Sequence, residues 1–333
     1  MKRLCRIAGL FASAAAWATA ASLAAAQPPQ GAPPSTKNGV HVCLQCHNQP
    51  PANLVLQTPH AVKADARTPF AQQQCETCHG ASAAHVEVAG TPVAVVYKGP
   101  KRSPVAQRNA VCLSCHEAGL RTYWTGSQHE SRGVACNDCH TIHARIQPVL
   151  SKATQAQVCF TCHKTQRAQI RRISAHPLAV TSLASTAKMS CSDCHNPHGS
   201  TGPSLMKRDT INDTCYTCHM EKRGPFVHNH EPVSENCANC HNPHGTIAEN
   251  LLKARPPFLC QECHTPHGPI VPQVVGQGQT GTINGVPATV TATSSGKAPL
   301  NFIMARGCTN CHTEVHGTNN PSTANPTPQF NFR

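Results

Sequence analysis

The chain carries ten copies of the pattern Cys-x-x-Cys-His, and of its 21 cysteines only Cys5 lies outside them. Every copy has the same spacing and a histidine directly after the second cysteine. We number the copies as motifs 1 to 10 in chain order. Motifs 1 to 5 are Cys43-Cys46-His47, Cys75-Cys78-His79, Cys112-Cys115-His116, Cys136-Cys139-His140 and Cys159-Cys162-His163. Motifs 6 to 10 are Cys191-Cys194-His195, Cys215-Cys218-His219, Cys237-Cys240-His241, Cys260-Cys263-His264 and Cys308-Cys311-His312.

This pattern is the attachment site of a c-type haem. Its two thiols bond to the vinyl groups of the porphyrin, and the adjoining histidine becomes an axial ligand of the iron. Paired cysteines also occur in structural zinc sites, disulfide frameworks and thiol redox motifs. None of these needs a histidine after every second cysteine, and a redox motif normally occurs once. Ten uniform motifs therefore predict ten covalently attached haems c, whose chemistry is electron transfer.

The remaining histidines are numerous enough to supply a second axial ligand to every haem. Only four methionines follow the first residue, so histidine is the main candidate. Histidine on both faces gives low-potential, six-coordinate haems with no vacant position for a substrate, which favours an electron-transfer protein over an enzyme. The twelve histidines outside the motifs are His41, His60, His85, His129, His143, His176, His198, His228, His230, His244, His267 and His316.

The spacing of these histidines indicates an internal repeat. After a motif histidine, the next candidate follows either 11 to 13 residues later, as in His47 to His60, or within six, as in His195 to His198. The order is long-short four times and then short-short, which suggests a two-haem unit. A histidine three residues after His195 cannot readily reach the opposite face of the same haem, because the ring and two iron–nitrogen bonds of about 2 Å intervene. The short-step histidines are therefore expected to ligate a neighbouring haem.

Residues 1–26 have the features of a cleaved signal peptide. Met1-Lys2-Arg3 is a basic start, residues 4–23 are apolar and alanine-rich, and Ala24-Ala25-Ala26 offers an A-x-A cleavage pattern. An uncleaved membrane anchor is the alternative, although the segment is weakly apolar. Cleavage would discard Cys5, and we expect export to the periplasm of a Gram-negative cell.

Composition predicts that the haems themselves form the core. The 307 residues that remain after cleavage provide about thirty for each motif, too few to build a separate large core around each haem. The 28 prolines and 21 glycines indicate a loop-rich shell. The fold expected is an elongated multihaem c-type cytochrome with little β structure and short α-helices, many of them following the motifs.

Net charge would ordinarily suggest a nucleic-acid or membrane-surface partner, but that inference fails for this chain. Loss of Lys2, Arg3 and Arg6 lowers the formal charge from +13 to +10. Ten haems would add about twenty propionates, partly offset by ferric iron, so the holoprotein is expected to be near neutral when oxidised. We therefore expect no nucleic-acid partner.

By haem count the mature chain divides into two pentahaem halves, residues 27–165 with haems 1 to 5 and residues 166–333 with haems 6 to 10. The join is residues 164–190. Because haems 5 and 6 form one long-short unit, the two-haem repeat crosses this boundary. We therefore expect one continuous haem wire and no hinge at the join.

The stretch from motif 6 to motif 9 resembles the MtrA/PioA/MtoA type of decahaem cytochrome, also called DmsE-like. The resemblance rests on Asn196-Pro197-His198-Gly199, its repeat Asn242-Pro243-His244-Gly245, and Asn212-Asp213-Thr214-Cys215-Tyr216. It extends over the mature chain apart from the proline-rich lead and the tail after Gly317. It implies that ten histidines are distal ligands and that His41 and His228 are not. The ten are His60, His85, His129, His143, His176, His198, His230, His244, His267 and His316.

The resemblance also implies a function and partners. Such cytochromes sit inside an outer-membrane β-barrel porin of the MtrB/PioB kind and carry electrons across the membrane. Periplasmic or inner-membrane c-type cytochromes exchange electrons on the inner side. The outer partner is an extracellular donor or acceptor, or an outer-surface multihaem cytochrome, in metal reduction or Fe(II) oxidation. A soluble periplasmic shuttle stays the alternative, and a multihaem reductase is less favoured because no motif is altered.

Overall fold

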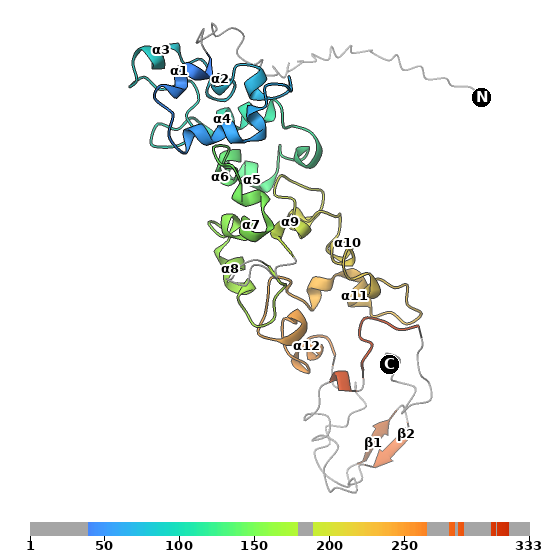
Figure 1. The fold of residues 1–333 in the computed structure, drawn as a ribbon. Helices are drawn as coiled ribbons and strands as arrows, with labels where there is room; N and C mark the ends of the chain where they lie inside the picture. The colour runs from blue at the N-terminus through green and yellow to red at the C-terminus, as the bar shows by residue number, and fades with distance from the viewer. Residues whose placement is uncertain are drawn as a thin grey trace, which may run out of the picture.

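The computed structural model describes residues 39–178, 189–264, 280–283, 286–289, 308–310 and 312–319. The proposed signal peptide, His267 and Cys311 lie outside the described residues. Figure 1 shows an elongated arrangement, with α1 to α4 gathered at one end and α12 far along the molecule. No helix in the described ranges is long and apolar enough to cross a membrane.

The helices are short and are separated by turns and loops. The α-helices are α1 (Val40–Leu44), α2 (Cys75–His79), α3 (Ala83–Glu87), α4 (Val105–Leu113), α5 (Gln128–Ser131), α6 (Cys136–Cys139), α7 (Lys152–Cys159), α8 (Lys164–Ile170), α9 (Cys191–Cys194), α10 (Ile211–Tyr216), α11 (Glu231–Glu235) and α12 (Phe258–Gln261). The 3₁₀ helices are η1 (Ala52–Gln57), η2 (Pro59–Ala61), η3 (Pro69–Ala71), η4 (Gly119–Arg121), η5 (Pro148–Leu150), η7 (Pro203–Leu205), η8 (Met220–Lys222), η9 (Cys237–Asn239), η10 (Glu249–Leu251) and η12 (Cys308–Asn310).

The β structure of the described residues is one hairpin. Strand β1 (Thr280–Ile283) pairs antiparallel with β2 (Val286–Thr289), with Thr280 opposite Thr289 and Ile283 opposite Val286. This agrees with the expectation of a helical, loop-rich chain with little β structure.

The helices alternate in how they hold the motifs. In motifs 1, 3, 5, 7 and 9 the first cysteine lies near the end of a helix, as Cys112 does in α4. In motifs 2, 4, 6, 8 and 10 a short helix begins at the first cysteine, as α6 does at Cys136. Short helices also follow many of the motifs, as expected, and α8 and η8 begin directly after motifs 5 and 7. Eight of the twelve described α-helices contain motif cysteines, because the two thiols and the histidine need one helical turn to share a face.

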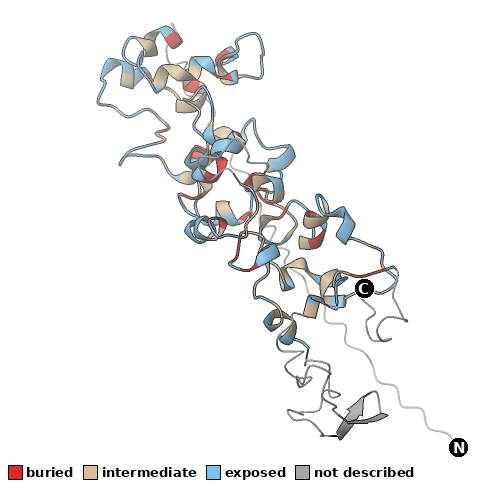
Figure 2. Ribbon diagram, turned by 60° about the horizontal axis from the view of Figure 1, so that its bottom comes forward, coloured by how far each residue is buried: buried red, intermediate tan, exposed pale blue. Residues whose placement is uncertain are grey.

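Apolar side chains form only a small core in the described residues. Ala156, Phe160 and Ile170 make one cluster, against which Leu178 and Cys191 pack. Buried residues occur in short separate patches along the molecule (Figure 2) rather than in one interior. A continuous cavity of about 4210 Å³ is lined by residues from Pro59 to His316 and by motif cysteines and histidines along its length. Polypeptide thus forms a thin shell around this space, as expected if haem forms the core.

Candidate haem-binding sites

Nine motif histidines of the described residues each face one of the predicted distal histidines. The two ring centroids of each pair are 6.0 to 6.5 Å apart. In the order of motifs 1 to 9, the pairs are His47–His85, His79–His143, His116–His60, His140–His198, His163–His129, His195–His244, His219–His176, His241–His316 and His264–His230.

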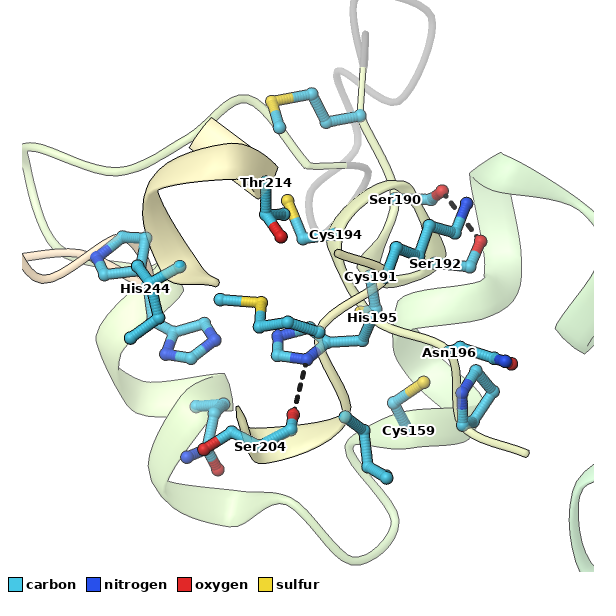
Figure 3. A pocket seen from close by; sticks show the side chains of 18 of the residues that line it. Cys159, Ser190, Cys191, Ser192, Cys194, His195, Asn196, Ser204, Thr214 and His244 are labelled. Carbon is cyan, nitrogen blue, oxygen red and sulfur yellow. Dashed lines mark hydrogen bonds between the residues drawn. The ribbon is translucent and has the colours of Figure 1, made fainter. Parts of the chain in front are cut away.

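This separation fits a metal ion held between two imidazoles. Two metal–nitrogen bonds of about 2 Å, with about 1 Å more from each nitrogen to its ring centre, give about 6 Å between centroids. Figure 3 shows one such pair, His195 and His244, at one wall of the cavity. Their centroids are 6.0 Å apart and their planes differ by 12°. The donor set and the geometry therefore fit a haem with an axial histidine on each face.

The second ring nitrogen of many of these histidines is held by a hydrogen bond. The Nδ1 of His195 contacts the carbonyl oxygen of Ser204 at 3.0 Å (Figure 3). On the distal side, the Nδ1 atoms of His129 and His176 contact the carbonyl oxygens of Pro197 and Pro243 at 2.7 and 2.8 Å. When Nδ1–H donates to a carbonyl, the tautomer is fixed and Nε2 is left free for a metal.

Burial also keeps several of these imidazoles neutral, the form in which histidine binds a metal. Desolvation lowers the pKa of His60, His79, His143 and His244 below the ordinary value. It lowers the pKa of His198 to about 4.

The order of the pairs follows a rule that ties motifs two apart. For the odd motifs from motif 3 onward, the distal histidine follows the motif two places earlier in the chain. His129, which follows motif 3, thus faces His163 of motif 5. The partner of an even motif comes from two places later, as His198 after motif 6 faces His140 of motif 4. His198 thus lies beside a haem site other than that of motif 6. His41 and His228 take part in none of these described pairs.

Consecutive motifs are also joined through their cysteines. The side chains of Cys112 and Cys136 lie close together, and the same approach brings together the first cysteines of motifs 1 and 2, 5 and 6, 7 and 8, and 9 and 10. Between these units, the second cysteines approach, as Cys78 does Cys115 and Cys139 does Cys162. Burial raises the pKa of Cys78 and Cys139. The motifs therefore form a file of two-motif units.

Buried amides, whose role the sequence did not predict, join the two helices of three units. Asn109 Oδ1 accepts a hydrogen bond from Cys136 N at 2.9 Å. Asn212 Oδ1 accepts one from Cys237 N at 2.7 Å, and Gln155 Oε1 accepts one from Ser192 N at 2.9 Å. Each amide lies three or four residues before the first cysteine of an odd motif, and that recurrence is the signal that could have revealed it.

The Asn-Pro-His-Gly repeats dock one unit onto another. Gly199 has a φ of +112°, and a Cβ there would lie 2.0 Å from the carbonyl oxygen of Tyr123. Gly245 has a φ of +130°, and a Cβ there would lie 2.3 Å from the carbonyl oxygen of Gln169. Only glycine permits both this backbone conformation and this approach. The repeat was evident in the sequence, but its role in joining distant segments was not.

A zinc assignment of the motifs finds no support in this arrangement. A structural zinc site needs about four ligands around one point. Within the described ranges no group of three or more histidine, cysteine, aspartate or glutamate side chains could hold a metal ion together. The histidines instead face each other in twos across the cavity, as haem requires.

Helical CxxCH segments around a cavity faced by paired histidines define a multihaem c-type cytochrome. Residues 184–224 and 230–269 match the family model of the doubled CXXCH motif, and residues 75–162 match that of the cytochrome c-type protein NrfB-like. The chain is 42% identical over 285 residues to the multiheme cytochrome MtrA of Shewanella baltica (strain OS185), covering 85% of this chain and 80% of that protein. The chain therefore belongs to the MtrA family of multihaem cytochromes, and it is an electron carrier with several covalently attached c-type haems.

Proposed function

We propose that this chain binds ten haems c and conducts electrons across the outer membrane inside a β-barrel partner. The inner end exchanges electrons with periplasmic or inner-membrane c-type cytochromes. The outer end serves an extracellular donor or acceptor, directly or through an outer-surface multihaem cytochrome. Export by a cleaved signal peptide and a periplasmic position at the outer membrane belong to the same proposal.

The observation that carries the proposal is the set of nine facing histidine pairs. In each pair the proximal ligand comes from the motif that holds the haem, and the distal ligand comes from the segment that follows a different motif. His267, which lies outside the described residues, completes the ten distal ligands of this proposal. When bound, the haems supply one-electron redox centres of low potential. With both axial positions taken by histidine, no coordination site is left for a substrate, so the chain turns over no substrate of its own.

Crossed ligands support a continuous path rather than two separate halves. His176 lies within the join of residues 164–190 and faces His219 of motif 7, while His198 of the second half faces His140 of the first. The side chains of Cys159 and Cys191 lie close together across the boundary at residue 165. Because His198 of the second half faces a motif of the first half, the two halves cannot separate without losing an axial ligand. The division at residue 165 therefore separates the chain by haem count and not into independent structural units.

A barrel partner follows from the physics of the bilayer. The hydrocarbon core is about 30 Å thick, and exposed loop backbone cannot lie in it unsatisfied. A loop-rich cytochrome that carries electrons through this layer must therefore be sheathed, and a wide outer-membrane barrel can enclose such a plug.

The proposal can be tested in proteoliposomes made with the outer-membrane fraction that contains this chain. Reduced methyl viologen is trapped inside, and ferric citrate is added outside. We expect oxidation of the internal dye that requires the chain, and loss of it when the chain is deleted from the source strain. Recovery of the chain only in the soluble periplasmic fraction, with no transfer across the liposome membrane, would contradict the proposal and favour a soluble shuttle.

A further inference from the structure

The Nδ1 atoms of the distal histidines differ in their partners, and the difference singles out motifs 3 and 4. His129, His176 and His230 each place Nδ1 against a backbone carbonyl oxygen, at 2.7, 2.8 and 3.0 Å. The Nδ1 atoms of His60 and His198 are buried and have no hydrogen-bond partner. His60 faces motif 3 and His198 faces motif 4, so both described distal histidines whose Nδ1 is buried without a partner fall in the unit of motifs 3 and 4.

This difference acts on the iron through the strength of the ligand. An imidazole whose N–H donates to a carbonyl is more basic and stabilises the more positive, ferric iron. Without an acceptor the imidazole is a weaker donor, and the balance moves toward the ferrous state. Because both nitrogens are buried, solvent water cannot replace the missing acceptor.

A positive charge beside the same two sites acts in the same direction. Arg121 Nε donates to the carbonyl oxygen of His116 at 3.0 Å. Its guanidinium also lies near the imidazoles of His116 and His198. A nearby cation favours the less positive, reduced state of each haem. Arg108, a buried arginine of the same unit, is 3.8 Å from the Asp138 carboxylate, which offsets its charge.

Motif 7 offers the opposite environment. The distal His176 donates to the Pro243 carbonyl oxygen, and the proximal His219 has the Glu221 carboxylate 3.6 Å from its Nδ1. Both features stabilise ferric iron.

We propose that the residues around His60, His198 and Arg121 make haem sites 3 and 4 the most easily reduced pair of sites 1 to 9, so that this pair holds electrons within the file. An electron that leaves a neighbouring ferrous haem is retained at this pair, the donor haem becoming ferric, until a further electron or an acceptor moves it on. This inference rests on the bis-histidine ligation of the proposed function.

The test is a reductive titration of the purified, fully matured holoprotein, followed by electron paramagnetic resonance. Imidazole planes that are near parallel or near perpendicular give different ferric low-spin signals. The planes are 81° apart at site 3 and 13° apart at site 4. We therefore expect the first two electrons to remove one ferric spin from the near-perpendicular signals and one from the near-parallel signals.

The variant Arg121→Gln should shift these first two reductions to lower potential, and Arg121→Lys should largely preserve them. The matched control is Arg171→Gln, the same change at an exposed arginine outside the cavity lining, which should leave the titration unchanged.

A high-spin ferric signal before any titration would instead contradict the ligation on which the inference rests. A fully low-spin protein whose first two electrons enter one signal family, or whose first reductions are the same in Arg121→Gln, would overturn this inference alone.

Discussion

Replacing Gly245 by alanine should damage two haem sites at once. Gly245 ends the turn that carries His244, which faces His195 at site 6. In the same turn, the Pro243 carbonyl oxygen accepts a hydrogen bond from His176, which faces His219 at site 7. A side chain at a φ of +130° costs about 1–3 kcal/mol in backbone strain. The Cβ would also lie 2.3 Å from a backbone carbonyl oxygen, which adds about 1–3 kcal/mol of overpacking. We therefore expect a loss of about 2–6 kcal/mol in the free energy of unfolding.

Two further glycines separate strain from displacement. Gly133 has a φ of +71° and open space around it, so Gly133→Ala should cost only the strain. Gly90 has open space around it and no positive φ, so Gly90→Ala should keep the free energy of unfolding within about 0.5 kcal/mol of the parent value. Guanidinium unfolding followed by haem absorbance measures these losses, and carbon monoxide binding to the reduced protein counts opened sites. We expect Gly245→Ala alone to gain up to two equivalents. Equal behaviour of Gly245→Ala and Gly133→Ala would refute the docking role of this turn.

Three other outcomes follow from the same geometry. Asn212→Ala removes the acceptor of Cys237 N and the donor to two carbonyls, so it should cost about 2–4 kcal/mol of unfolding free energy. The change Asn239→Ala at an exposed asparagine should cost under about 1 kcal/mol. Equal losses would contradict the role of Asn212 in joining the two helices. The electron paramagnetic resonance spectrum of the ferric protein should show two families of low-spin signals. The imidazole planes are near parallel at sites 1, 4, 6, 8 and 9 and near perpendicular at sites 2, 3 and 5. A single family of signals would contradict these ring angles. His41→Ala and His228→Ala should bind no more carbon monoxide than the parent; a gain by either would show that a ligand had been overlooked.

Local chemistry made the cofactor and the fold class predictable from the sequence. A Cys-x-x-Cys-His segment carries its attachment chemistry within five residues, so ten copies can be interpreted without any tertiary information. The small number of residues for each haem likewise predicted a haem core, and the small cluster around Phe160 agrees with it.

The pairing of histidines was not predictable, because it depends on contacts between residues far apart in the chain. His129 and Pro197 are 68 residues apart, and His230 and Val315 are 85. Sequence spacing excluded the nearest haem for His198 but could not choose among the others. The role of the buried amides Asn109 and Asn212 was not predictable for the same reason, since an asparagine before a cysteine has no chemistry of its own until a second helix is brought against it.

The variant His198→Ala tests the central claim, the crossed histidine pairs, most directly. The reduced parent protein should bind essentially no carbon monoxide, and the variant should bind about one equivalent, because only the distal ligand of site 4 is lost. Adding Cys136→Ala and Cys139→Ala to the variant removes the haem of that site and should abolish the gain. A variant that stays fully low-spin, or carbon monoxide binding that survives the loss of motif 4, would contradict the pairing of His198 with His140.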